Sequence, residues 1–356
     1  MSYPLAILGT GMVSALSDSA AGNAALMRCH YNNHLPTHFY DADSGEPYLG
    51  SYAHLNKNDA KKLGLDRLVA LSTTAIRDVL STQNIQISDT PLLVNFPQSN
   101  ELSLVSTATI EQTFMDQLAT QLNETVFSSN SVFFQEGSTG FVSTLQKAQE
   151  YIKQEKAEQV LLLMVDSLLN HHRIAHYENW HDDLPRLLTD DNPNGFIPGE
   201  AAVAVLVGKP DPGQPQTLIL GSGTAEEEAT IGSGKVLKAQ GLSQAIRNAA
   251  EDAAIRVCDT EFRISNTNGE EYWFREASLA QSRALEQKRS SHPLWHPADS
   301  IGEVGAAAGG AMVVMAHYAF NNSYALGSCA LCHLSGDSTE RAAFIVKSTR
   351  EEFTTQ

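Results

Sequence analysis

Short apolar runs and amphipathic segments alternate along the chain, and the same succession occurs twice. Residues 5–11 form an apolar run that ends in a glycine turn, and residues 218–223 have the same character. Both runs are typical of buried strands. After each run, apolar residues recur at helical spacing, over residues 59–82 and 242–257. Each half of the chain is therefore predicted to begin with a strand and an amphipathic helix.

The remaining predicted elements also occur in matching pairs. They are strands at 91–96 and 261–265, helices at 107–122 and 272–287, glycine-started helices at 137–145 and 302–317, and closing strands at 159–166 with 201–207 and at 325–334 with 342–347. Glycine and alanine let backbones approach closely, so the glycine-started helices suit the middle of a protein. Alternating strands and helices predict a mainly parallel sheet with helices on both faces.

The repeat predicts two halves, residues 1–208 and 217–350. The segment between them, residues 209–216, contains three prolines and a glycine, and this composition is typical of a link. Neither glycine-started helix can be covered by its own half alone. We therefore expect an α/β protein in which two similar halves pack in layers as one integrated unit.

The composition excludes several classes of function. Apolar residues make up 42% of the 356 residues and charged residues 18%, which indicates a globular chain. With 24 basic and 41 acidic side chains, the net charge of -17 disfavours nucleic acid as a partner. No apolar run reaches the roughly 20 residues that span a bilayer. The N-terminus also lacks the pattern of a signal peptide, so we expect a cytoplasmic protein with no membrane partner.

Four cysteines, Cys29, Cys258, Cys329 and Cys332, are too few to staple a chain of this length. Cys329, Cys332 and His333 match the short c-type haem attachment pattern, and a metal or redox pair is an alternative. The surrounding stretch, residues 324–334, is apolar and strand-like. We interpret the two cysteines as core residues and expect no cofactor and no metal.

Three motifs resemble signatures of the β-ketoacyl synthases, the condensing enzymes of the thiolase superfamily. The motifs are GTGMVSAL at residues 9–16, NGFIPGEAA at 194–202 and IGEVGAAAG at 301–309. The resemblance extends from about residue 3 to residue 347 and implies the family's thiolase-like, duplicated five-layer α-β-α-β-α fold. The glycine pair of the first motif would also suit a dinucleotide site, but no βαβ unit with a suitably placed acidic residue follows it.

The resemblance also implies where catalytic residues should stand, and the chain departs from the family at each place. Gly137 occupies the position of the nucleophilic cysteine, and Asn268 and Glu303 occupy the positions of the two histidines. Ala298 replaces the expected lysine, and residues 335–339 depart from the family's glycine-rich closing loop. Condensation needs a thiolate at a helix N-terminus and imidazole donors for the enolate. We therefore expect no condensing activity.

Ser138, Glu136 and Glu303 remain as candidates for altered acyl chemistry. Ser138 points about 100° away from the adjacent position on a helix, and we interpret it as a cap of that helix. Glu303 could act as a general base, hold a cationic ligand group, or be a carboxylate stabilised near a helix start. If Glu136 and Glu303 both face the pocket, their charge opposes the anion of a condensation. The residues expected to line the pocket are Phe196, Gly195, Gly302 and Ser335.

Histidines and acids are densest between residues 171 and 183, where the chain has His171, His172, His176, His181, Asp182 and Asp183. His172 and His176 have a spacing that zinc ligation can use on a helix. Tyr177, Trp180 and Pro185 favour another interpretation, an exposed aromatic connection that in the family lies near the pocket entrance and the dimer contact.

Lys147, Lys153 and Lys156 are interpreted as a solvated helix face. The alternative is a contact for an acidic acyl carrier protein, which the net charge of -17 opposes at long range.

Two functions from different classes follow from these residues. The first is a β-ketoacyl synthase-like protein without condensing activity that acts as a binding, scaffolding or adaptor subunit. Its partner would be a second copy of itself, an active homologue, as in the chain-length factors of polyketide synthesis, or a secretion-associated protein. The second is an acyltransferase or thioester hydrolase that uses Ser138, Glu136 or Glu303. The sequence leaves open whether an acyl chain or an acyl carrier protein binds.

Overall fold

The predicted strands and helices are present, and several differ from the prediction in where they end. The structure is a computed structural model that describes residues 2–98, 107–124, 127–180 and 185–350. The first half contains β1 (Leu5–Val13), α1 (Ala20–Arg28), β2 (Leu35–Tyr40), β3 (Pro47–Gly50), α2 (Gly64–Thr82), β4 (Leu92–Asn95), α3 (Thr107–Leu122), β5 (Val132–Phe134), α4 (Phe141–Lys153), β6 (Gln159–Ser167), α5 (His171–Glu178) and β7 (Glu200–Gly208). The second half contains β8 (Thr217–Glu226), α6 (Gln240–Asp252), β9 (Phe262–Ser265), α7 (Glu271–Ala284), β10 (Leu294–Trp295), α8 (Ala298–Ile301), α9 (Ala308–Asn321), β11 (Cys329–Ser335) and β12 (Glu340–Ser348).

Two five-stranded sheets, one from each half, are joined through β1 and β8. The strand order is β10-β9-β11-β12-β8-β1-β7-β6-β4-β5. The link between the sheets is short, with Leu5 opposite Ile219 and Ala6 opposite Leu218. The predicted link at residues 209–216 is the turn between β7 and β8.

The prediction of a mainly parallel sheet was wrong, because each sheet is mixed. β4 is parallel to β5 and β6, and β9 is parallel to β10 and β11. The β6/β7, β1/β7, β8/β12 and β11/β12 ladders are antiparallel. Two strands joined by a turn as short as residues 336–339 can only pair in the antiparallel sense, since a parallel pair needs a long crossover.

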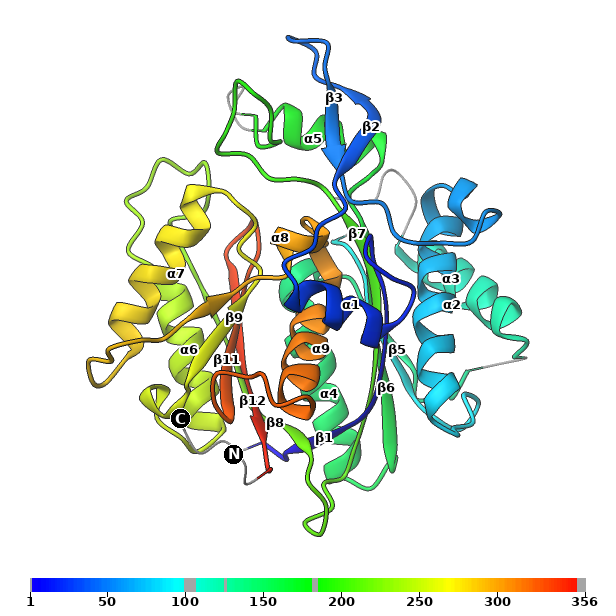
Figure 1. Ribbon diagram of the computed structural model, residues 1–356. Coiled ribbons are helices and arrows are strands. Elements are labelled where there is room, and N and C mark those ends of the chain that lie inside the picture. The colour runs from blue at the N-terminus through cyan, green and yellow to red at the C-terminus, as the bar shows by residue number, and fades with distance from the viewer. Residues whose placement is uncertain (1, 99–106, 125–126, 181–184, 351–356) are drawn as a thin grey trace.

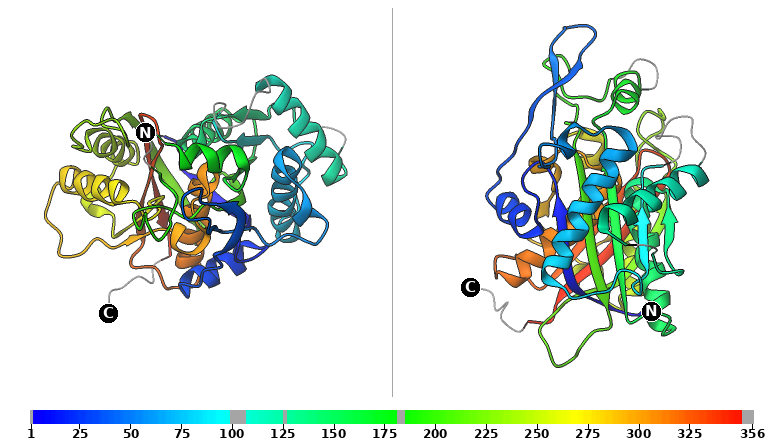
Figure 2. Two further views of the ribbon diagram at one scale, coloured as in Figure 1. Left: turned by 90° about the horizontal axis from the view of Figure 1, so that it is seen from above. Right: turned by 90° about the vertical axis from the view of Figure 1, so that its right-hand side faces the viewer.

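The layers follow the predicted five-layer order. In Figure 1, α2 and α3 cover one sheet, α6 and α7 cover the other, and α4 and α9 lie between the two sheets. Figure 2 shows the same arrangement from above, with the outer helix pairs at opposite sides. The β2–β3 hairpin and α5 rise from one end of the molecule.

The middle layer is held by apolar side chains from both halves. Its cluster includes Phe141 of α4, Met312 of α9, Val203 of β7 and Phe344 of β12, all fully buried. A Cβ added at Gly309 of α9 would lie 2.5 Å from the Cβ of Phe141, so glycine sets how closely α9 and α4 approach. No helix in the part of the chain that the structure describes has the length and apolar character needed to cross a membrane.

Several element boundaries differ from the prediction. The helices predicted to start at residues 59, 137 and 302 begin at Gly64, Phe141 and Ala308. The helix predicted to run to residue 257 ends at Asp252, and a 3₁₀ turn, Val257–Asp259, follows separately. The strand predicted from residue 325 begins at Cys329.

Candidate functional site

A small polar cavity lies where the two central helices begin. The 3₁₀ turn Gly137–Gly140 leads into α4, the 3₁₀ turn Gly305–Ala307 leads into α9, and both turns contact the same space. The cavity volume is about 30 Å³. That volume holds roughly two water molecules. A site for a drug-sized ligand usually measures about 300 Å³ or more, so this cavity has no room for an acyl chain as it stands.

The structure brings together the three positions that the resemblance assigns to the family's cysteine and two histidines. Gly137, Asn268 and Glu303 all line the cavity, as do Ser138, Phe196 and Ser335. Gly137 has a φ of +61°, and its carbonyl accepts a hydrogen bond of 2.8 Å from Asn95 Nδ2. No cysteine and no histidine is found among the described residues that line the cavity.

Asn268 and Glu303 form a pair across the cavity. Asn268 Nδ2 donates to Glu303 Oε2 at 3.0 Å, and the Gly305 N–H donates to Glu303 Oε1 at 2.9 Å. Burial raises the pKa of Glu303 to about 7, and Asp337 and Glu270 add to the rise while the two donors oppose it. The carboxyl group is therefore about half protonated near neutral pH.

The cavity wall contains a buried arginine that sequence reasoning missed. Arg186 is 3% exposed; its Nε and Nη2 donate to the two carboxylate oxygens of Glu270 at 2.7 Å each, and its Nη1 lies 2.9 Å from Asp337 Oδ1. Four aromatic rings surround the guanidinium at 4.5 to 5.9 Å, those of Tyr177, Trp180, Phe196 and Trp273. Burial alone would lower the pKa of Arg186, but Asp337 and Glu270 raise it above its ordinary value. The guanidinium is a fixed positive charge that fills the space beside the cavity.

A second carboxylate occupies the start of α9. Asp166, at the end of β6, accepts the Ala306 N–H at 2.9 Å, and its carboxylate lies 3.8 Å from Arg173. Gly305 has a φ of +48°, and a Cβ there would collide with Asp166. Asp166 and Glu303 together take the N–H groups of residues 305 and 306, where a helix N-terminus favours negative charge.

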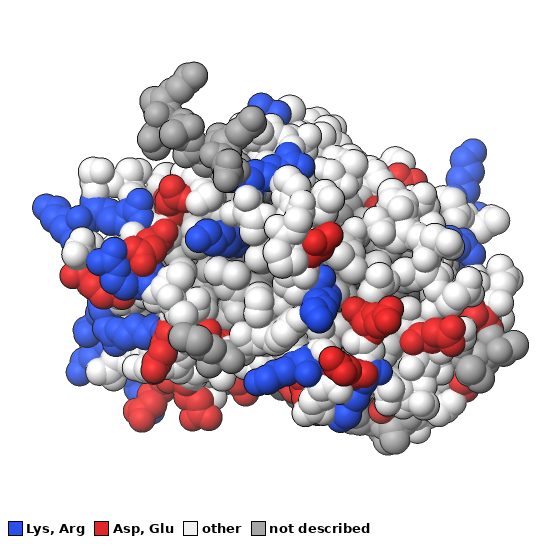
Figure 3. Space-filling model, turned by 90° about the horizontal axis from the view of Figure 1, so that it is seen from below, with Lys and Arg blue, Asp and Glu red and all other residues white. Residues whose placement is uncertain are grey.

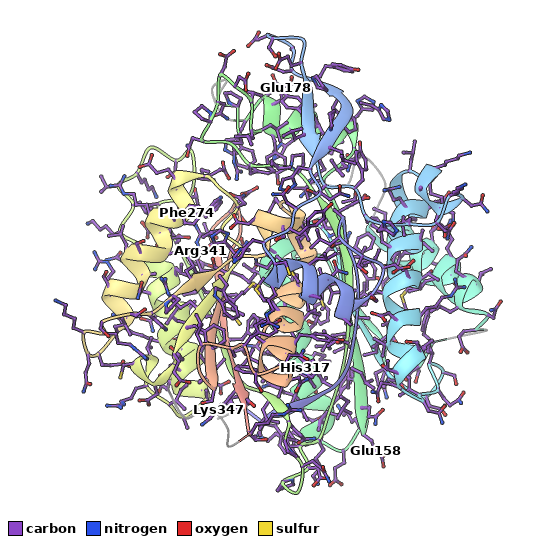
Figure 4. All side chains as sticks on the ribbon, viewed as in Figure 1. Glu158, Glu178, Phe274, His317, Arg341 and Lys347 are labelled. Atoms are coloured by element: carbon purple, nitrogen blue, oxygen red, sulfur yellow. The ribbon has the colours of Figure 1, made fainter. Side chains whose placement is uncertain are left out.

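A buried network supports the cavity from the second half. Arg341 of β12 donates to Glu276 of α7 at 2.7 Å, and both side chains are almost fully buried. Ser335, which lines the cavity, donates to the same carboxylate at 2.6 Å. Figure 4 shows Arg341 inside the molecule, whereas Glu178 lies at its end beside the β2–β3 hairpin.

Some residues predicted for the site lie elsewhere. Glu136 is exposed, accepts a hydrogen bond from Ser143, and is not among the residues that line the cavity. Gly195 and Gly302 lie behind the wall: a Cβ at Gly195 would meet the Leu187 backbone, and one at Gly302 would lie 2.8 Å from the Ile197 carbonyl oxygen. The predicted capping role of Ser138 was wrong, because no side chain caps the turn at Gly137–Gly140 or the start of α4.

The middle sequence motif performs a structural task. Glu200 is fully buried and forms a bidentate ion pair with Arg67 of α2; it also accepts hydrogen bonds from Ser167 and the Ala53 N–H. Gly199 lets the backbone pass close to the Ile301 carbonyl. The Gly199-Glu200 pair thus fixes the start of β7 against α2 and α8 without touching the cavity.

The described part of the histidine-rich segment forms α5, and Tyr177 and Trp180 are buried rather than exposed as expected. His171 packs on Phe39 with ring centroids 4.9 Å apart, and His176 packs on Trp180 at 4.7 Å. Among the described residues, no three His, Cys, Asp or Glu side chains are grouped so that they could hold a metal. His181, Asp182 and Asp183 lie outside the described residues. Cys329 and Cys332 are free and buried on β11, as the core interpretation predicted.

Two of the three lysines on and after α4 are paired with Glu150. Lys147 lies 2.8 Å from Glu150, and Lys156 lies 3.5 Å from the same carboxylate. Lys153 is exposed. Figure 3 shows acidic and basic side chains interspersed on the lower face of the molecule.

Only one of the missed cavity residues had a sequence signal. Asp166 ends an apolar run, Val160 to Val165, and a polar residue at the carboxyl end of a strand is a common site signature in α/β folds. Arg186, Glu270 and Asp337 come from three loops that are distant in sequence, and nothing local distinguishes them from surface charges.

Comparison with known proteins shows the fold. No protein-family model matches the sequence, and no curated protein is similar to it by sequence. Solved structures match nearly the whole chain. A β-ketoacyl synthase from Burkholderia phymatum STM815 has a TM-score of 0.69 at 14% identity, covering 98% of this chain and all of that one.

Complexes of ketosynthases are also among the matches. A chain of the ketosynthase–chain length factor complex from Xenorhabdus doucetiae has a TM-score of 0.73 at 13% identity, covering 97% of this chain and 98% of that one. A chain from a type II polyketide synthase acyl-carrier protein complex with its ketosynthase has a TM-score of 0.77 at 12% identity, covering 98% of this chain and all of that one. The protein therefore has the thiolase-like fold of the ketosynthases, as the motifs predicted.

Proposed function

We propose that this protein is a ketosynthase-fold subunit without condensing activity that binds or scaffolds another protein. Its partner would be a second copy of itself, an active homologue or a secretion-associated protein. One observation carries the proposal: the cavity that holds Gly137, Asn268 and Glu303 has no thiol and no imidazole among its described lining residues. Ketosynthase chemistry needs both groups.

Two further observations support this proposal. The cavity of about 30 Å³ is too small for an acyl chain, and Arg186 with its two carboxylates fills the adjoining space. In the chain length factor complexes, a ketosynthase is paired with a subunit of that name. Pairing of two different subunits therefore has a precedent among proteins with this fold.

Co-purification tests the binding role. Tagged protein is isolated from its native cell, and its oligomeric state and bound molecules are measured by native mass spectrometry. A stoichiometric protein partner supports the proposal. If only a homodimer is recovered, with neither another protein nor an acyl chain, an active homologue or a secretion-associated protein is left without support as the partner. If only monomer is recovered, the result contradicts all three proposed partners.

The second candidate function is acyl transfer or thioester hydrolysis. The observation in its favour is that Ser138 lines the same cavity as Glu303, whose pKa is about 7. A base with that pKa suits neutral pH. Purified protein is incubated with acyl and malonyl thioesters while thiol release and intact mass are followed. An acyl adduct that is lost in Ser138→Ala but kept in Ser143→Ala would replace the scaffold proposal.

A further inference from the structure

Glu303 is the one cavity carboxylate, among the described residues, that is not within ion-pair distance of an arginine. Glu270 and Asp337 share Arg186, and Asp166 lies 3.8 Å from Arg173. Within the described ranges, the donors to Glu303 are the neutral groups Gly305 N–H and Asn268 Nδ2. Its charge is therefore the least compensated in the cavity.

The turn between β11 and β12 borders the cavity and is held by two arginines. Arg341 Nη1 donates to the carbonyl oxygens of Gly336, Ser338 and Glu340 at 2.8 to 3.0 Å, and Arg186 holds the Asp337 side chain. Gly336 and Asp337 line the cavity, whereas the next two residues of the turn are exposed. Asp337 is held by Arg186 at 2.9 Å and by the Tyr177 hydroxyl, which donates at 3.1 Å. The Asp337 side chain is 25% exposed, against 3% for Arg186 and 4% for Glu270. Of these three charged groups, Asp337 has the most freedom to move outward.

The balance of charge around the cavity depends on Glu303. The other charged residues that line the cavity are Asp166 near the end of β6, Arg173 on α5, Arg186 and Asp337, and Glu270 is paired with Arg186. Three carboxylates and two guanidinium groups leave one excess negative charge when Glu303 is neutral. Ionised Glu303 raises the excess to two, and Asp337 is the first charged neighbour that opposes its ionisation. This opposition is reciprocal, because the interaction free energy belongs to the pair.

We propose that Glu303 controls the turn over the cavity through its proton: neutral Glu303 leaves Asp337 seated on Arg186, and ionised Glu303 repels Asp337 and loosens the turn. Loosening the turn opens the cavity toward the exposed residues Ser338 and Thr339. This effect of Glu303 on the turn does not depend on which partner the protein binds. Its test is therefore independent of the scaffold proposal.

Hydrogen exchange tests this control on the full chain. Protection of the amides at residues 335–340 is measured at pH 6 and pH 8.5, with corrections for the intrinsic exchange rates. In the wild type, protection should fall about fivefold or more at the higher pH, the size of a modest coupling free energy. In Glu303→Gln, protection should be the same at both values. Glu226→Gln, which alters an exposed carboxylate on the neighbouring strand β8, should behave as the wild type.

A second variant keeps the test decisive if Glu303→Gln folds poorly. Asn268→Leu removes a donor that favours ionised Glu303, so the pH at which protection falls should move upward. Protection that is independent of pH in the wild type, an equal fall in Glu303→Gln, or an unchanged midpoint in Asn268→Leu overturns the proposal.

Discussion

At the residue scale, ion pairs differ widely in how much they contribute to the free energy of unfolding. Arg186 is enclosed by two carboxylates and four rings, whereas Arg256 forms its ion pair with Asp259 at the surface, where the side chains are 60% and 40% exposed. A buried ion pair that loses one partner leaves an uncompensated charge, and an exposed pair is screened by water.

Replacing Arg186 should therefore be costly. Arg186→Met leaves Glu270 and Asp337 without their counter-charge, and we expect a loss of about 3 to 5 kcal/mol in the free energy of unfolding. Arg256→Met is the matched control and should cost far less, because water screens its ion pair. Urea unfolding of both variants measures the difference. Equal effects would mean that Arg186 is not held as the structure shows.

Glu303 should make stability depend on pH in the opposite sense to most carboxylates. Its folded pKa of about 7 lies above the unfolded value, so the folded state binds the extra proton and stability is lost as pH rises from about 4.5 to about 7. At pH 8, the free energy of unfolding of Glu303→Gln should exceed that of the wild type by about 1 to 3 kcal/mol, and at pH 4.5 the two should be equal. Thermal unfolding across this range checks the prediction, and a variant that is less stable at pH 8 contradicts it.

At the element scale, strand β11 shows what burial does to polar residues. His333 is 2% exposed and pairs with Ser265 of β9 in the parallel ladder. Burial, together with the nearby Arg263 and His292, lowers the pKa of His333 to about 3. Cys329 and Cys332, on the same strand, belong to the clusters on opposite faces of the sheet. Their haem-like spacing is a consequence of two cysteines falling in one buried strand.

The same strand should make the second half sensitive to acid. Because the folded pKa of His333 lies below the unfolded value near 6.5, its contribution to stability is lost as pH falls from 6.5 toward 3. At pH 5 this loss amounts to about 2 kcal/mol relative to pH 8. His333→Leu should remove that part of the acid sensitivity, whereas the exposed His172→Leu should not. Unfolding free energies at pH 5 and pH 8 give the comparison, and equal pH dependence in both variants would exclude His333 as the source.

At the scale of the whole molecule, the middle layer belongs to neither half alone. Phe141 of α4 packs against Phe344 of β12 with ring centroids 4.7 Å apart, and Gly309 of α9 packs against Phe141. We propose that residues 1–208 and 217–350 are halves of one folding unit. If either half were absent, the central helix of the other half would lose part of its apolar cover.

Cutting the chain in the link tests this proposal. Residues 1–208 expressed alone should lack cooperative unfolding and dispersed amide signals, because α4 and β1 lose the apolar cover that the second half supplies. Co-expression with residues 209–356 should restore both, since the cut falls at the start of a mostly exposed turn. An independently folded 1–208 fragment would show that the halves are separate domains.

The sequence by itself determined the duplication and the order of the main elements, and the motif resemblance implied the five layers. Apolar periodicity and glycine placement are local properties, and the fold follows from burying each apolar face. The motif resemblance supplied the positions of Gly137, Asn268 and Glu303, which the structure brings to one cavity. The short turn before β12 also indicates antiparallel pairing of β11 and β12. The prediction of a mainly parallel sheet relied on the alternation of strands and helices and did not use this turn.

Only the tertiary structure decided what surrounds those positions. Arg186, Glu270 and Asp337 come from separate loops, and their pairing depends on how three layers meet. The tertiary structure also decides that Glu136 is exposed to solvent and that the buried Glu303 has a pKa of about 7. A side chain's charge state depends on its burial and on the charges near it, and neither is a property of its place in the sequence.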